Sequence, residues 1–353
     1  MKNNIVITAV GDIQLSRDIK KYITKCKQED YSNIFKYVKK YIEKSDISIA
    51  NLESPISNKE NLKKKFMKGS PNFLAEEKSV EALINSGLNT LTIANNHSND
   101  YGNKAIKDTI KILNKHNFNI LSVKEQPYKL FNINGYKIII IGMTRKFNKL
   151  NINPVDIYIY NEDTPKLLKY LKKKCDLLIV TIHWGGEYKF TNNKNQKKMA
   201  TKMIKNGVDI IIGHHPHVIQ NMEKISINDN YGYVFYSLGN FIFDSHYKKK
   251  GVRDTMILKI IIDKNTKKYN FEYLPCIIYP QLGFIPKPKI QNFIKKYPSS
   301  YTKEGNDLYN NVFKYLNCKN IISGGKYNIN LKKFISFTII ISLYFIFLKV
   351  LFS

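Results

Sequence analysis

Short apolar runs alternate with stretches of helical periodicity along most of the chain. Runs typical of strands occupy residues 5–10, 46–50, 89–94, 128–133, 136–141, 176–182, 209–212, 233–238, 255–262 and 268–278. Helical patterns cover residues 20–44, with a break near 29–32, and residues 76–86, 102–117, 164–174 and 195–206. This alternation of strands and helices indicates an α/β fold.

Two hairpins add antiparallel strands to this scheme. Asn134-Gly135 separates the runs at 128–133 and 136–141, and this dipeptide is a strong hairpin signal. Residues 255–262 and 268–278 are expected to pair as a later hairpin. The sheets should therefore be mixed rather than purely parallel.

The amino-acid composition changes after Pro275. Prolines recur at 275, 280, 286 and 288, and the chain from about 285 to 333 is polar and lysine-rich, with one helix expected at 306–316. We therefore expect one domain over residues 1–284, followed by an extension or linker over 285–333.

The last stretch of the sequence has the properties of a membrane span. Residues 334–348 carry no charge, and a helix over 334–353 would be about 30 Å long, which matches a bilayer core. Lys332 and Lys333 precede it, and Lys349 could reach the interface. Because the segment is apolar on every face, a single-pass anchor is favoured over a buried core helix. No signal peptide is expected before the first strand, so the positive-inside tendency predicts a cytoplasmic domain.

Charge and cysteine content narrow the choice of partners. The chain has 353 residues, with 57 Lys+Arg against 28 Asp+Glu, which gives a formal charge of +29. Such an excess reflects either codon bias or an anionic partner, namely a polyanion, a nucleic acid or a membrane surface. No nucleic-acid-binding motif is present, so we expect no nucleic acid. The four cysteines form no CxxC pair, which excludes a thiolate metal site and suits a reducing compartment.

Polar or metal-binding residues follow six of the predicted strands. In open α/β sheets, ligands bind beyond the carboxyl ends of the strands. Oxygen and nitrogen donors without sulfur fit one or two divalent transition ions, Mn, Fe or Zn. The residues at these strand ends are Asp12, Glu53, Asn96 with His97, His183, His215 with His217, and Asn240.

Three of the seven histidines lie in one turn after residues 209–212, at 214, 215 and 217. A tight turn with three imidazoles favours a metal site over a solvated loop. Singly, the other residues have ordinary alternatives: Asp12 or Asn240 could form a turn, Glu53 could be a loop charge, and His183 could be a core histidine. Trp184 either stacks on a substrate or forms a wall of the site, and the second is favoured.

Six motifs, in order, resemble those of the capsule-synthesis CapA family, whose members are linked to poly-γ-glutamate production. They are GDIQLSR (11–17), NLESPIS (51–57), TIANNHSNDYG (92–102), HWGGEY (183–188), GHHPHVIQ (213–220) and YSLGNFIFD (236–244). The resemblance covers about residues 5–280. That family is similar to calcineurin-like metallophosphoesterases, which implies a two-sheet mixed β sandwich flanked by helices.

The resemblance implies a role for each motif residue. The metal ligands are expected to be Asp12, Glu53, Asn96, His183, His215 and His217, with His97 as the catalytic histidine. Arg17, Trp184, Glu187 and Asn240 lie in the same motifs and are expected to contact the substrate. His214 matches no ligand position. Gln14 stands where phosphoesterases usually place a histidine, and Glu53 is one methylene longer than the usual aspartate, so one ion, or one strong and one weak ion, is possible.

Three functions are compatible with these residues. The first is a membrane-anchored, metal-dependent hydrolase that cleaves or releases poly-γ-glutamate or a related anionic polymer. The second is a non-catalytic assembly or export subunit that packs with a membrane synthase, and the third is a general phosphodiesterase acting on phosphorylated substrates. The presence of His97 favours an enzyme. Proteins resembling this family often carry an N-terminal anchor and an external domain, so an external face remains open.

Overall fold

The computed structural model describes residues 4–26, 30–58, 62, 72–145, 156–228, 230–244, 246 and 248–296. The helix expected at 306–316 and the apolar segment 334–353 lie outside these residues, as does most of the extension expected at 285–333. Within the described ranges, no helix is both long and apolar enough to cross a membrane. The expected domain limits and the anchor therefore stay predictions.

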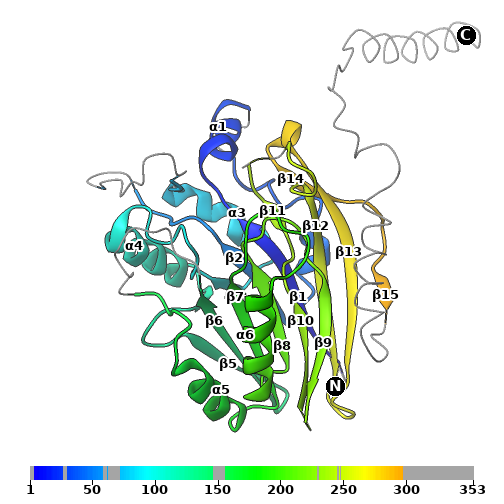
Figure 1. The fold of residues 1–353 in the computed structure, drawn as a ribbon. Coiled ribbons are helices and arrows are strands. Elements are labelled where there is room, and N and C mark those ends of the chain that lie inside the picture. Colours follow the sequence, from blue (N-terminus) through cyan, green and yellow to red (C-terminus); the bar gives the residue numbers. More distant parts are fainter. Residues whose placement is uncertain are drawn as a thin grey trace, which may run out of the picture. The chain divides into compact units, whose positions relative to one another are not determined.

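The first of two sheets has nine strands and is mixed, as predicted (Figure 1). Its main order is β14-β13-β12-β1-β2-β3-β4, with β11 beside β1 and β15 beside β13. The strands from β1 to β4 run parallel, whereas β12 pairs antiparallel with both β1 and β13. The bounds are β1 (Asn4–Ile13), β2 (Ile47–Leu52), β3 (Thr90–Thr92), β4 (Asn119–Leu121), β11 (Asn240–Ile242), β12 (Asp254–Asp263), β13 (Tyr269–Tyr279), β14 (Ile285–Pro288) and β15 (Ile294–Lys296).

The second sheet has six strands in the order β5-β6-β7-β8-β10-β9. Its four central strands are parallel, and β5 and β9 join antiparallel at the edges. The hairpin predicted from Asn134-Gly135 is confirmed, with Ile133 opposite Tyr136. The bounds are β5 (Tyr128–Ile133), β6 (Tyr136–Thr144), β7 (Leu177–His183), β8 (Ile210–His214), β9 (Met222–Ile227) and β10 (Asn230–Phe235).

Helices cover the outer faces of both sheets. Apolar residues of α1, α3 and α4 pack in one cluster against the first sheet, and those of α5 and α6 in another against the second. The bounds are α1 (Arg17–Cys26), α2 (Lys39–Ile42), α3 (Val80–Ile84), α4 (Gly102–Lys115), α5 (Thr164–Lys172) and α6 (Lys194–Lys205), with 3-10 turns η1 (Glu77–Ser79) and η2 (Pro280–Leu282). The layers are thus helix, sheet, sheet, helix, as the family resemblance implied.

The long helix expected over residues 20–44 is wrong in its second half. The structure has α1, a series of turns and then the single turn of α2. Asp30 accepts hydrogen bonds from the backbone N–H of Ser32 and from the side-chain amide of Asn33. Such local bonds give the backbone an alternative to the helix.

Alternating side chains explain how two sheets share one core. Ile138 and Ile140 of β6 point between the sheets, where they join Ile5 and Ile7 of β1. Ile139, between them in sequence, faces α5 and α6 on the other side. The period of two along each strand lets both faces of the second sheet be buried.

Glycines bring the carboxyl ends of the strands into close contact with the segment that follows β10. A Cβ on Gly11 would overlap the carbonyl oxygen of Gly239, and a Cβ on Gly213 would overlap that of Tyr236. Because neither glycine has a side chain, the ends of β1 and β8 lie against the chain leading into β11. This close packing forms the base of the region in which the polar residues at the strand ends lie.

Candidate metal centre

Asp12 lies near the end of β1 and is completely buried. Its Oδ1 accepts a hydrogen bond of 2.8 Å from the Asn51 amide, and its Oδ2 accepts one of 3.2 Å from the backbone N–H of His215. His217 Nδ1 lies 3.6 Å from Oδ2. The first sheet thus supplies a carboxylate that directly meets the histidine turn of the second sheet.

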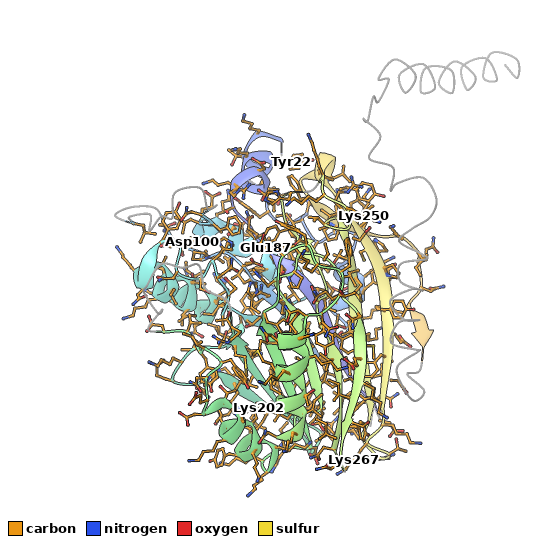
Figure 2. All side chains as sticks on the ribbon, in the orientation of Figure 1. Tyr22, Asp100, Glu187, Lys202, Lys250 and Lys267 are labelled. Carbon is orange, nitrogen blue, oxygen red and sulfur yellow. The ribbon has the colours of Figure 1, made fainter. Side chains whose placement is uncertain are left out.

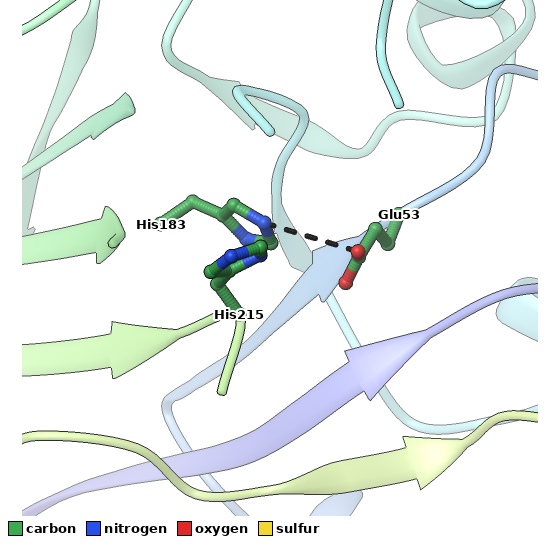
Figure 3. Close-up of side chains that lie close together, drawn as sticks. All are labelled: Glu53, His183 and His215. Atoms are coloured by element: carbon green, nitrogen blue, oxygen red, sulfur yellow. Dashed lines mark ion pairs between the residues drawn. The ribbon is translucent and has the colours of Figure 1, made fainter. Parts of the chain in front are cut away.

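Glu53 follows β2 and faces the same histidines. Its backbone N–H donates to the Ile13 carbonyl oxygen at 2.7 Å, which fixes it beside the end of β1. Its Oε1 lies 3.8 Å from Nε2 of His183 (Figure 3). The same oxygen lies 3.8 Å from Nε2 of His217. Among the described residues this buried oxygen has no hydrogen-bond partner. A buried carboxylate oxygen without a hydrogen bond is costly unless a cation satisfies it.

His183 is the last residue of β7, and both ring nitrogens are engaged. Its Nε2 lies 2.7 Å from Asn96 Oδ1, and its Nδ1 lies 3.3 Å from the Asn51 amide nitrogen. The ring centroids of His183 and His215 are 4.7 Å apart. Asn96, which follows a predicted strand, therefore lies at the histidine cluster and contacts it through His183.

The turn GHHPH holds its histidines in an unusual backbone conformation. His215 has φ of 96° and His217 has φ of 57°, values that non-glycine residues rarely adopt. His217 Nδ1 lies 2.9 Å from Asn240 Oδ1, which fixes the orientation of the ring. His214 Nδ1 lies 3.1 Å from Asp12 Oδ1, but neither ring nitrogen of His214 makes a hydrogen bond with a described residue.

Burial sets the charge states of these side chains. Burial and, next, the positive charge of His215 hold the pKa of His183 well below its usual value. Burial also lowers the pKa of His217, and the nearby Asp12 offsets this only in part. Burial, followed by the charges of Asp12 and Glu187, raises the pKa of Glu53 well above its usual value. Neutral imidazoles result, and neutral imidazole is the form that binds metals.

The geometry gives overlapping groups of possible ligands. In each group the ligand atoms all lie within 4.8 Å of one another. Donors bound to one ion at about 2.0–2.2 Å lie about 3–4.4 Å apart, so only a small contraction is needed. Glu53 belongs to two groups and could be shared by two ions. The groups are Glu53 with His183 and His215, Asp12 with Glu53 and His217, and Glu187 with His215 and His217.

His97 lies beside this cluster and is oriented by a carboxylate. Its Nδ1 is 2.7 Å from Asp100 Oδ2, and its ring packs on Phe73 with centroids 3.9 Å apart. Asp100 also accepts a 2.8 Å hydrogen bond from the Phe73 backbone N–H. A carboxylate on Nδ1 leaves Nε2 as the nitrogen available for proton transfer.

The four residues expected to contact substrate lie in different settings. Trp184 is buried in the core, where Nε1 donates to the Tyr236 carbonyl oxygen at 3.0 Å and the two rings stack. This placement fits a wall behind the site. Asn240 is buried and holds His217, whereas Glu187 is exposed near the turn (Figure 2). Arg17 is partly exposed, with its guanidinium 5.4 Å from the Phe73 ring centroid.

Two side chains inside the site were not singled out from the sequence. Asn51 donates to Asp12 and, at 3.4 Å, to Glu53, and it contacts His183, so it links ligands of both sheets. Its place in the NLE motif, two residues before Glu53, was the available signal. Asp100 had a comparable signal, three residues after His97 in the ANNHSNDYG motif. Gln14, the departure noted above, turns away from the ligands and donates to Asp244 at 3.3 Å.

Comparison with known proteins agrees with the motifs. Residues 6–245 match the family described as bacterial capsule synthesis protein PGA_cap. The chain is 34% identical over 265 residues to the capsule biosynthesis protein CapA of Bacillus anthracis, covering 69% of this chain and 61% of that protein. It is 32% identical over 284 residues to the PGA biosynthesis protein CapA of Bacillus subtilis (strain 168), covering 76% and 70%. The match thus spans about three fifths of the length of the first relative.

A solved structure described as a novel phosphatase from Mycoplasma pneumoniae is also similar. It has a TM-score of 0.48 and 18% identity, with 78% of this chain and 95% of that chain covered. At this level the likeness carries no argument about activity. The family assignment rests instead on the match over residues 6–245 and on the two Bacillus relatives, and by these this chain belongs to the bacterial capsule synthesis (CapA) protein family.

Proposed function

We propose that this protein is a metal-dependent hydrolase of capsule-polymer synthesis that cleaves or releases poly-γ-glutamate or a related anionic polymer. The observation that carries the proposal is Glu53 Oε1, a buried oxygen equidistant from two imidazole nitrogens at 3.8 Å. A shared cation would satisfy this oxygen and join the two sheets. The polymer is suggested by the family and by the name of the Bacillus subtilis relative, a PGA biosynthesis protein.

The ligand set fits one or two divalent transition ions. Asp12, Glu53, Asn96, His183, His215 and His217 offer oxygen and imidazole donors without sulfur, which suits Mn, Fe or Zn. Because Gln14 is held by Asp244 and by the Ser16 backbone, the group around Asp12 lacks a further ligand there. We therefore expect the group of Glu53, His183 and His215 to bind more tightly. Such ions, when bound, polarise substrate oxygens and lower the pKa of water.

His97 supplies the proton transfer in this proposal. Asp100 holds Nδ1 and stabilises a positive charge on the ring, so Nε2 can hold a proton and donate it to a leaving group. The Phe73 ring covers one face of the imidazole and limits its rotation. Neither role needs His97 to bind a metal.

Metal content and cleavage test the proposal together. The purified full-length protein should contain one to two equivalents of a transition metal by elemental analysis, and His183→Ala should lower this content. His116→Ala is the matched control, because His116 ends α4 outside the ligand groups. Metal-loaded protein should then be incubated with poly-γ-glutamate and with a generic phosphodiester.

The outcomes of these assays separate the alternatives. A metal-free protein whose stability is unchanged by chelation would refute the metal site. Cleavage of the phosphodiester alone would favour a general phosphodiesterase. A metal-loaded protein that cleaves neither, in cells whose polymer production survives His97→Ala, would favour an assembly subunit acting with a membrane synthase.

We also propose that residues 334–353 anchor the protein in the cell membrane with its folded domain in the cytoplasm. Support comes from the uncharged stretch 334–348 and from the lysines that precede it. Membrane fractionation of full-length protein and of a chain ending at residue 333 tests the anchor. Protease treatment of spheroplasts tests the side, since an external domain would be digested.

A further inference from the structure

Positive φ values extend from the ligand cluster to three nearby residues that belong to none of the ligand groups. Besides His215 and His217, positive φ values occur at Arg17 (53°), Tyr188 (61°) and His246 (50°). Non-glycine residues in this backbone conformation are strained, and such residues gather at functional sites. A role as metal ligands explains the positive φ of His215 and His217. It does not explain the positive φ of the other three residues.

Tyr188 forms the connection between the ligand turn and the surface. Its backbone N–H donates to the Pro216 carbonyl oxygen at 2.8 Å, and its ring centroid lies 6.0 Å from that of His217. Lys249 Nζ lies 3.9 Å from the centre of the same ring, and the His246 ring is 5.4 Å away. Tyr188 therefore lies next to both a candidate metal ligand and a cation.

The loop that carries Lys249 is anchored to the ligand cluster. The amide nitrogen of Asn240 donates to the Val252 carbonyl oxygen at 3.2 Å, while its amide oxygen holds His217. Gly251 has φ of 77° and lies so close to Phe190 that a Cβ would overlap the ring. The same asparagine thus fixes a ligand and the base of the lysine loop.

Arg17 is a second cation near Tyr188. Its guanidinium lies over Phe73, whose ring also packs on the catalytic candidate His97. Its side chain is 34% exposed, and its Nε is 3.8 Å from Asp244 Oδ1. Arg17 also lies close enough to Tyr188 for its charge to act against the burial that raises the pKa of that hydroxyl. Two carboxylates also lie near that hydroxyl, namely Glu187, which is exposed and hydrogen-bonds to it, and the buried Glu53.

We propose that Lys249, Tyr188 and Arg17 form a subsite that binds a carboxylate of a polyanionic chain beside the ligand cluster. An ammonium held on an aromatic face is already oriented, and the guanidinium offers planar donors that match a carboxylate. Lys248 and Lys250 flank Lys249 in sequence and add to the attraction of an anionic chain. The proposal rests on the proposed function for the position of the reaction centre, but it requires neither a bound metal nor cleavage.

Binding of poly-γ-glutamate oligomers to the full-length, EDTA-treated protein tests this subsite. Lys249→Gln should raise the Kd about three- to fivefold, as expected for loss of one partly exposed ion pair. Lys249→Arg should restore binding, because it keeps both the charge and the contact with the ring. Lys202→Gln removes the same charge from the exposed face of α6, away from Glu187 (Figure 2), and should leave the Kd nearly unchanged. Tyr188→Leu should weaken binding, whereas Tyr188→Phe should not.

Three results would overturn the subsite. These are equal effects of Lys249→Gln and Lys202→Gln, absence of oligomer binding by the unmodified chain, and Lys249-dependent binding of polyphosphate in place of poly-γ-glutamate. Since the assay contains no transition metal, failure of the metal or cleavage assays leaves this test intact. A subsite confirmed without cleavage would refute only the hydrolase.

Discussion

Replacing Glu53 with glutamine should change stability in opposite directions with and without a divalent ion. Burial, and next the charge of Asp12, raises the pKa of Glu53 well above its usual value of about 4.3. Above that value the unfolded chain loses this proton while the folded protein keeps it. The stability of the metal-free protein therefore falls as the pH rises from about 4 toward the folded-state pKa.

The size of each effect follows from this linkage. Every pH unit between the unfolded and folded pKa values removes about 1.4 kcal/mol of unfolding free energy. Glutamine keeps the shape without the charge, so the metal-free Glu53→Gln variant should be more stable than the parent at neutral pH. An ion at about 100 times its Kd stabilises the parent by about 2.7 kcal/mol. For a fold of about 290 residues that corresponds to roughly 4–5 °C in Tm. Most of this gain should vanish in the variant, which lacks the shared ligand.

Thermal unfolding followed by circular dichroism between pH 5 and pH 8, in EDTA and in Mn²⁺, measures both effects. Glu125→Gln is the control, because Glu125 is exposed and belongs to none of the ligand groups. An undiminished gain of Tm in Mn²⁺ for Glu53→Gln would refute its role as a ligand. A metal-free variant less stable than the parent at pH 8 would refute the electrostatic reasoning.

Three further predictions concern proton transfer and packing. His97→Ala should lower the cleavage rate by about 10²–10⁴-fold with metal content unchanged, and Asp100→Asn should lower it less; loss of metal in either variant would contradict this. Asn193→Ala removes the side chain that caps α6 and should cost about 1 kcal/mol in urea unfolding without changing metal binding. Gly213→Ala should cost at least about 1–3 kcal/mol in the same assay, because its Cβ would overlap a backbone carbonyl. Gly186→Ala should cost less than about 1 kcal/mol, because its Cβ would make only an ordinary contact with the Lys189 side chain at 3.7 Å.

The regular parts of the fold could be predicted because each has a local signal. The helix expected at 102–117 is α4, the one at 195–206 is α6, and both hairpins are present. Short strands such as β4, β9 and β11 were missed, since three to six residues without alternation carry no period to read. The helix expected over residues 20–44 was too long, because the side chain of Asp30 makes local hydrogen bonds that hydrophobic periodicity does not reveal.

The site was predictable as a set of strand ends but not as a set of contacts. Parallel strands place their carboxyl ends at one edge, and this accounts for the meeting of Asp12 with Glu53. That Asn51 would touch ligands from both sheets depends on how the sheets pack, which no short sequence window contains. Trp184 directly follows His183 in sequence, yet its indole is buried in the apolar cluster between the second sheet and its helices.

The division of the candidate ligands between two sheets would also determine when the proposed ion can bind during synthesis. Asp12 and His215 are 203 positions apart, and the ligand groups join the first sheet to the second. Ribosomes add about 5–20 residues per second, so roughly ten to forty seconds separate the emergence of these two residues. His183 emerges before the turn and can meet Glu53, but each ligand group also needs His215 or His217. Under the proposed metal site, an ion would therefore stabilise only a chain that has emerged beyond the GHHPH turn and docked both sheets.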